Sequence, residues 1–236
     1  YPGFFSTLTL AYLPTSHGVS DNRSAEDSLA LHYRTLLESG DELTLLTARV
    51  LERTALGGAW ESSFDLGETL TGIGSRIEAV VYEPDASLSN SQGKTEERSV
   101  QMIAGVDCQT QTDNLLTDGI LITLEYLHSG SGAETPSELE PVRQSALVKQ
   151  GIQPQLSQQV MGLGLGKTLS PLWQGNYTGL FSPLSGGASQ LHQISGVYSL
   201  SDESDLMLSL LSGFGSEISE FGSVPTSLSA RLRLYF

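Results

Sequence analysis

The segment LSARLRLYF, residues 228–236, alternates between apolar and more polar side chains. Successive side chains of a β-strand point to opposite faces, so this alternation predicts a strand with one apolar face. The apolar face carries Leu228, Ala230, Leu232, Leu234 and Phe236. The opposite face carries Ser229, Arg231, Arg233 and Tyr235. One face therefore suits lipid, and the other suits water.

The same segment closes on an aromatic residue, Phe236. An alternating strand that ends in this way resembles the C-terminal signature of bacterial outer-membrane β-barrel proteins such as porins. The resemblance implies an all-β fold, namely an antiparallel up-and-down transmembrane β-barrel in the outer membrane of a Gram-negative bacterium. It also implies contact with outer-membrane lipid and lipopolysaccharide. It indicates an architecture and a location, but no substrate.

The composition agrees with one β-barrel domain over residues 1–236. The chain has 39% hydrophobic and 17% charged residues, which is less charge than a soluble domain usually carries. A transmembrane helix needs about 18 or more consecutive apolar residues, whereas the apolar runs here are short, as at residues 79–82. No signal peptide is visible. We expect either that an export signal has been removed or that the chain is the C-terminal part of a longer protein.

The net charge of −15 and the pI near 4.5 argue against nucleic acid as a partner. Many acidic residues fall in segments that we interpret as loops. There they either solvate the loops or bind divalent cations that bridge to anionic lipid head groups. The single cysteine, Cys108, cannot form an internal disulfide. Its phase places it on an apolar strand face, where a thiol behaves as a small hydrophobic group.

A search for alternating segments of the roughly 9–11 residues that a tilted membrane strand needs gives about twelve strands. They are predicted at residues 3–13, 27–38, 42–53, 57–66, 69–82, 98–110, 117–128, 157–169, 171–182, 189–200, 204–214 and 226–236. In most of them, charges share the phase of the small and polar residues. The third segment is ambiguous because Leu43 and Leu45 share a phase with Arg49 and Arg53. The tenth is ambiguous because its apolar residues are divided between both phases.

The predicted connections alternate in length. Those after even-numbered strands are short, as in SGDE, GET, LSP and SDES, and most of those after odd-numbered strands are long. RTALGG and SPLSGGA are shorter than this rule expects. Outer-membrane barrels have tight periplasmic turns and long outer loops, so the alternation agrees with the barrel interpretation. Residues 129–155 form either a constriction loop or a mobile external loop, and their composition favours the mobile loop.

Known catalytic and phosphate-binding motifs are not indicated. The stretch VMGLGLGKTLS has Met161 where a phosphate-binding loop needs glycine, and Gly162, Gly164 and Gly166 recur on one strand face. An outer-membrane hydrolase, an alternative to a pore, would need a serine nucleophile beside a histidine base. No histidine is followed by a serine two residues later, and His192 and Ser195 have opposite phases. No cluster has metal-ligand spacing, and we expect neither a cofactor nor catalysis.

The charged residues of the polar strand faces are the strongest functional candidates. Basic and acidic members occupy largely different arcs of the predicted wall, an arrangement that resembles the transverse field of general porins. The basic candidates for lining a pore are Arg34, Arg49, Arg76, Arg231 and Arg233. The acidic candidates are Glu61, Asp65, Glu78, Asp107 and Glu125.

We therefore expect a pore for the passive diffusion of small hydrophilic solutes or ions, without catalysis. A closed wall cross-linked by salt bridges is the structural alternative. The first functional alternative is the barrel of a secretion or surface-assembly complex, acting either as a translocation pore or as a scaffold for other envelope proteins. The sequence indicates neither the solute nor the oligomeric state.

Overall fold

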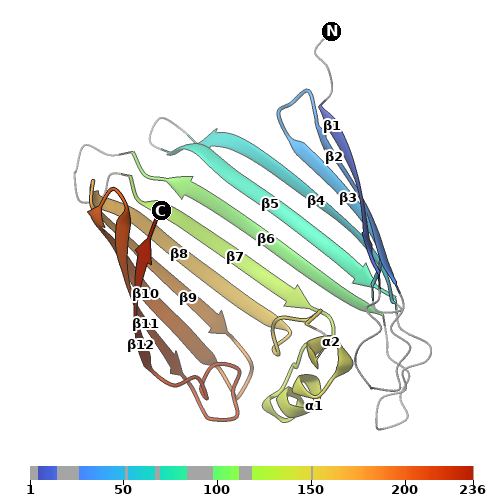
Figure 1. Ribbon diagram of the computed structural model, residues 1–236. Coiled ribbons are helices and arrows are strands. Elements are labelled where there is room, and N and C mark those ends of the chain that lie inside the picture. Colours follow the sequence, from blue (N-terminus) through green and yellow to red (C-terminus); the bar gives the residue numbers. More distant parts are fainter. Residues whose placement is uncertain are drawn as a thin grey trace. The chain divides into compact units, whose positions relative to one another are not determined.

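The computed structural model describes residues 5–14, 27–50, 53–66, 70–83, 98–111, 119–149 and 151–235. Within them, twelve strands follow one another in sequence order in one sheet (Figure 1). They are β1 (Ser6–Leu13), β2 (Ser28–Leu36), β3 (Glu42–Val50), β4 (Arg53–Leu66), β5 (Leu70–Tyr82), β6 (Ser99–Gln109), β7 (Leu121–Ser129), β8 (Gln159–Ser170), β9 (Trp173–Ser182), β10 (Ser189–Ser201), β11 (Ser204–Phe214) and β12 (Ser227–Leu234). The predicted all-β, antiparallel up-and-down fold is confirmed. Phe236 lies outside the described residues.

Internal contacts divide the chain into two compact units. The first unit joins Tyr1–Ser63 to Arg76–Ile103, and the second joins Phe64–Ser75 to Ala104–Phe236. Whether they form the single barrel domain expected from the sequence stays a prediction.

In the first unit, the register from β1 to β4 gathers the apolar side chains on one face. Leu10 lies opposite Leu31, and Tyr33 lies opposite Leu45. The register also settles the ambiguous third segment, because Leu43 pairs with Trp60 on this same face. We call this side the apolar face and the other side the polar face. The polar face carries Thr7, Thr9, His32, Arg34, Glu42 and Glu61.

The second unit is sorted in the same way from β7 to β12. Leu124 pairs with Leu163, and Ile194 pairs with Leu210. Ile194 and Tyr198 therefore belong to the apolar face, which settles the tenth segment. In the last strand, the predicted phase agrees with the register. Leu228, Ala230, Leu232 and Leu234 continue the apolar face, and Ser229, Arg231 and Arg233 continue the polar face.

The apolar faces are exposed rather than covered by a second layer. The exposed fraction is 67% for Leu10, 50% for Leu45, 50% for Leu124 and 57% for Ile194. A soluble β-sandwich buries the apolar face of each sheet. Among the described strand residues, by contrast, the buried apolar residues are few, namely Ala48, Ala55, Ile73 and Val160.

The connections alternate in length at most positions. The connections after even-numbered strands are short at residues 37–41, 67–69, 171–172 and 202–203, and those after odd-numbered strands are longer at 14–27, 83–98, 130–158, 183–188 and 215–226. Two connections depart from the rule, because residues 51–52 join β3 to β4 and residues 110–120 join β6 to β7.

The prediction that RTALGG is a connection is wrong, because β4 already begins at Arg53. The two glycines of this segment suggested a turn, but they lie inside the strand. A Cβ atom added to Gly57 would lie 2.9 Å from Val80 Cγ2. Glycine is therefore used here for close packing between neighbouring strands and not for a turn.

The expectation of a mobile loop at residues 129–155 is also wrong, because the described residues 129–149 and 151–155 are folded. It contains a short 3₁₀ helix (Pro136–Glu138) and the helices α1 (Leu139–Arg143) and α2 (Ala146–Lys149) (Figure 1). Leu139 packs with Ala133 and Leu184 in a small buried cluster. None of the helices in the described part of the chain is both long enough and apolar enough to cross a membrane.

Candidate functional site

Three charged side chains of the first unit, Arg34, Glu42 and Glu61, lie close together near the β2–β3 turn. Arg34 forms a salt bridge with Glu42, which lies directly opposite Glu61 in the β3–β4 register. The Arg34 guanidinium therefore lies beside two carboxylates that would otherwise repel each other. In the turn itself, hydrogen bonds from the Ser62 and Ser39 hydroxyls and the Trp60 side chain hold the pKa of Asp41 below its ordinary value.

Alternation places two further candidates on the polar face of the first unit. Gly57 belongs to this face by its pairing with Leu46, and it lies against Val80 of β5. Arg76 and Glu78 share the phase of Val80 along β5, so they also belong to the polar face.

Two arginines whose phase was ambiguous are separated by the register. Arg49 pairs with Leu29 and Thr54, so it lies on the apolar face and not among the polar residues. It stands one residue before the end of β3, where a long side chain can extend its charge toward water. Arg53 opens β4 on the polar face and is 2% exposed. Of these two, the register favours Arg53 over Arg49 as a residue of the polar face.

In the second unit, glycines leave room beside the acidic candidates. A Cβ atom added to Gly74 would lie 2.6 Å from Asp107 Oδ1, so the Asp107 carboxylate occupies the space above this glycine. Glu125 pairs with Gly162 across the β7–β8 ladder. Gly162, Gly164 and Gly166 all lie on the polar face, next to Glu125, Thr123 and Leu121. Small residues thus clear space beside charged ones on this face.

Asp65 has a different role from the other acidic candidates. Its Oδ1 accepts a hydrogen bond of 2.7 Å from the backbone N–H of Gly72. Because Gly72 has a φ of 64°, the chain there adopts a left-handed conformation that glycine accepts readily. Asp65 therefore holds the end of β4 to the first residues of β5.

Arg231 and Arg233 lie beside an acidic residue that sequence reasoning missed. Asp205 of β11 pairs directly with Arg233. Its carboxylate accepts hydrogen bonds of 2.9 Å from the Ser199 hydroxyl and 2.8 Å from the Tyr235 hydroxyl. In β11, Asp205 shares the phase of Met207 and Ser209, opposite to most of the leucines. This alternation in the sequence could have placed Asp205 on the polar face.

Three long connections of the second unit form a second candidate region, which we call the loop platform: residues 130–158, 183–188 and 215–226. Glu220 accepts hydrogen bonds of 2.9 Å and 2.8 Å from the backbone N–H groups of Leu156 and Ser157. The Ser157 hydroxyl in turn lies 2.6 Å from that of Ser182, and both residues are almost fully buried. The platform is thus held together by buried polar contacts, which the Ser- and Glu-rich composition did not reveal.

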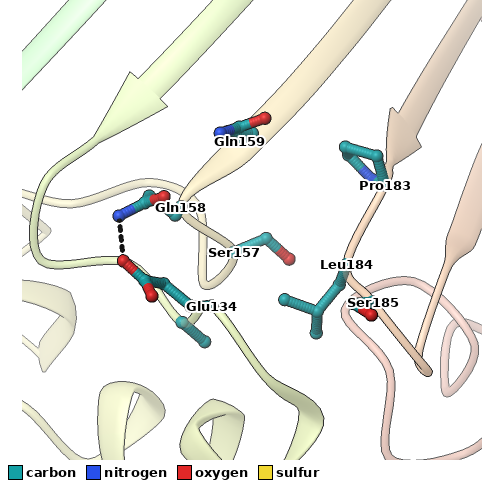
Figure 2. Close-up of a pocket in the computed structure, with 8 residues that line it drawn as sticks. Glu134, Ser157, Gln158, Gln159, Pro183, Leu184 and Ser185 are labelled. Carbon is teal, nitrogen blue, oxygen red and sulfur yellow. Dashed lines mark hydrogen bonds between the residues drawn. The ribbon is translucent and has the colours of Figure 1, made fainter.

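A pocket of about 260 Å³ opens in the loop platform. Figure 2 shows Glu134 and Gln158 on one side of it, and Pro183, Leu184 and Ser185 on the other. A hydrogen bond of 2.8 Å joins Gln158 Nε2 to Glu134 Oε1. The lining also includes Ala133, Ser157 and Gln159, so the pocket combines one carboxylate with amide, hydroxyl and apolar groups.

His192 lies on the apolar face and is bonded to residues other than Ser195. Its Nδ1 shares a hydrogen bond of 2.7 Å with the Tyr177 hydroxyl, and its Nε2 lies 3.0 Å from Gln190 Oε1. Ser195 lies on the polar face, so the register separates it from His192. Across the described ranges, we find no group of three or more His, Cys, Asp or Glu side chains that could hold a metal ion.

The two hydrogen bonds that Glu220 accepts from Leu156 and Ser157, which we call the Glu220 clamp, give a direct prediction. Glu220→Gln should raise the amide exchange rates of Leu156 and Ser157 by roughly tenfold or more, because a hydrogen bond to a charged group contributes about 1.5–3 kcal/mol. Hydrogen exchange measured by NMR or mass spectrometry would detect this, and exchange in the sheet should change little. Glu217→Gln, which alters an exposed carboxylate of the same connection, is the control. Unchanged protection in Glu220→Gln would contradict the clamp.

Comparisons with protein-family models, with curated proteins and with solved structures found no match to this chain.

Proposed function

We propose that the chain forms a transmembrane β-barrel in a bacterial outer membrane, through which small hydrophilic solutes or ions diffuse passively. The observation that carries this proposal is the exposed apolar face of both units, with charges kept to the opposite face at most positions. A monomeric soluble protein rarely exposes a contiguous apolar patch larger than a few hundred Å². Hydrocarbon and lipopolysaccharide acyl chains would cover this surface without any further protein layer.

Backbone hydrogen bonding supports the same proposal. In a bilayer, each backbone N–H and C=O group needs a partner within the protein, which only helices and closed barrels provide. The edge strands β1 and β12 both have eight residues, and an even number of strands makes them antiparallel. Pairing of β1 with β12 would close the barrel and is part of the proposal.

The aromatic residues of the apolar faces are consistent with membrane interfaces. Near the β8–β9 turn, the rings of Trp173 and Tyr198 lie 4.9 Å apart. Tyr198 lies near the end of β10, and near its start the ring of His192 lies 5.5 Å from that of Phe214 in β11. Transmembrane barrels carry aromatic girdles at both interfaces.

Passage would take place along the polar faces, turned toward the inside of the barrel. Solutes would diffuse through water, and fixed charges would bias which ions enter. A barrel of about twelve strands is wider than the eight-stranded case that side chains fill. The residues expected to line the pathway are Arg34, Glu42, Glu61, Arg76, Glu78, Asp107, Glu125, Asp205, Arg231 and Arg233.

Single-channel recording in planar lipid bilayers tests this function. We expect addition of the purified, refolded chain to give stepwise increases in current, because each inserted barrel opens one aqueous path. The heat-denatured chain is the control. If refolded chains insert into the membrane but carry no current, the proposed pore function is wrong, and the chain instead forms a closed barrel that acts as a scaffold.

A further inference from the structure

The pocket of the loop platform has a preformed shape. One wall is fixed by a β-bridge between Ala133 and Ser157. The Ala133 N–H donates a hydrogen bond of 2.7 Å to the Leu156 carbonyl. Glu220 holds Leu156 and Ser157 from the adjoining connection. Ser182, directly before the opposite wall, is tied to Ser157. A ligand would therefore bind with little ordering of the protein, which favours affinity.

The charge of the pocket selects the kind of ligand. Glu134 contributes a carboxylate, and the described residues that line the cavity include no lysine, arginine or histidine. Among the described residues, Gln158 occupies Glu134 Oε1, and no hydrogen bond reaches Oε2. The Gln158 side-chain nitrogen donates to Glu134, so the remaining polar atom of this amide is its oxygen, which is a further hydrogen-bond acceptor. The site thus supplies acceptors and negative charge, which favours a cationic hydrogen-bond donor over an anion.

The volume of the pocket and its other lining residues restrict the class of cationic ligand further. A divalent cation prefers several oxygen ligands from carboxylates, and the described residues hold no cluster of such groups. Ala133, Pro183 and Leu184 give the pocket an apolar wall. A pocket of about 260 Å³ is small compared with the roughly 300–1,000 Å³ of drug-sized sites. A short methylene chain with an ammonium end matches the apolar wall, the carboxylate and the volume together.

We propose that this pocket binds the primary ammonium end of an alkyl chain, supplied either by a small free amine or by a lysine side chain of another polypeptide. The ammonium group donates to Glu134 Oε2 and to the Gln158 side-chain oxygen, and the methylenes lie against Leu184 and Pro183. This binding goes beyond the passage of solutes and does not depend on it.

The test is an NMR titration of the refolded full chain in detergent micelles with n-butylammonium chloride. We expect saturable shifts of the Ala133 and Ser185 amides. n-Butanol keeps the methylene chain without the charge, and sodium chloride reproduces the ionic strength, so neither should give saturable shifts. Shifts of equal size with either control would overturn the proposal.

Two variants of the lining and one control variant test whether n-butylammonium binds in this pocket. Glu134→Gln should weaken binding by about tenfold, since it removes the charge and nearly keeps the size. Ser185→Trp keeps the charge but fills the pocket, and should also weaken binding. Glu140→Gln, on a helix outside the lining and paired with Arg143, should bind like the parent chain. Unchanged binding in Glu134→Gln, or an equal loss in Glu140→Gln, would refute a specific site.

The source of the ammonium group is distinguished by a second probe, Nα-acetyl-lysine methylamide. Tighter binding of this probe than of n-butylammonium supports the proposal with a polypeptide ligand. Tighter binding of n-butylammonium supports it with a free amine. If neither probe saturates, the proposal is wrong, whereas conduction measured in bilayers would be unaffected.

Discussion

Leu124→Arg is expected to lower the free energy of unfolding in lipid vesicles by about 2–4 kcal/mol, the cost of an arginine on the lipid-facing side near the bilayer midplane. Leu124 lies in β7, is 50% exposed and pairs with Leu163 on the apolar face. If that face meets hydrocarbon, the new charge loses its hydration and gains no partner. Reversible urea unfolding, followed by tryptophan fluorescence, measures the change.

Thr123→Arg is the matched control, one residue earlier in the same strand. Thr123 points to the polar face, where it pairs with Gly164. The glycine leaves space for the longer side chain, and water inside the barrel would solvate it. We therefore expect a much smaller loss of stability than in Leu124→Arg. A larger loss in Thr123→Arg than in Leu124→Arg would mean that the orientation of the sheet is reversed.

Reversing the charge of both Arg231 and Arg233 to glutamate is expected to shift the ion selectivity of the pore toward cations severalfold. The double variant replaces two positive charges on the polar face with negative ones, next to the existing carboxylate of Asp205. Charges that line a pathway raise the local concentration of counter-ions. The reversal potential under a salt gradient across a planar bilayer measures this ratio.

Arg143→Glu provides the control for the selectivity measurement. It makes one arginine-to-glutamate change of the same kind on α1, where Arg143 pairs with Glu140 outside the strands. We expect it to leave the reversal potential nearly unchanged. If the double variant conducts with the selectivity of the parent chain, Arg231 and Arg233 do not line the pathway.

The sequence predicts the strands well because alternation repeats within most of them. In β12, apolar and polar side chains alternate without interruption, so the phase could be assigned from the strand alone. In β10, apolar residues occupy both phases, and only pairing with β9 and β11 shows that Ile194 belongs to the apolar face. Register with neighbours, which one strand cannot reveal, decides such cases.

The boundaries and the loops were harder to predict, for physical reasons. Gly57 and Gly58 suggested a turn, but Gly57 serves close packing against Val80 of the neighbouring strand. That error assigned Arg53 to the third strand. The composition of residues 129–155 indicated a mobile loop, yet Glu220 binds backbone groups of the following residues 156 and 157, more than sixty residues before it in the chain. Long-range polar contacts of this kind have no periodic signature in the sequence.

The orientation of the sheet is tested most directly by spin labels placed one at a time at residues 121–127, in a Cys108→Ser background, with the chain in lipid vesicles. Oxygen concentrates in hydrocarbon, and a nickel chelate stays in water. We predict maximal oxygen accessibility at positions 122, 124 and 126, with nickel accessibility favouring positions 121, 123 and 125. The opposite phase, or equal accessibility at every position, would contradict a barrel whose apolar face meets lipid.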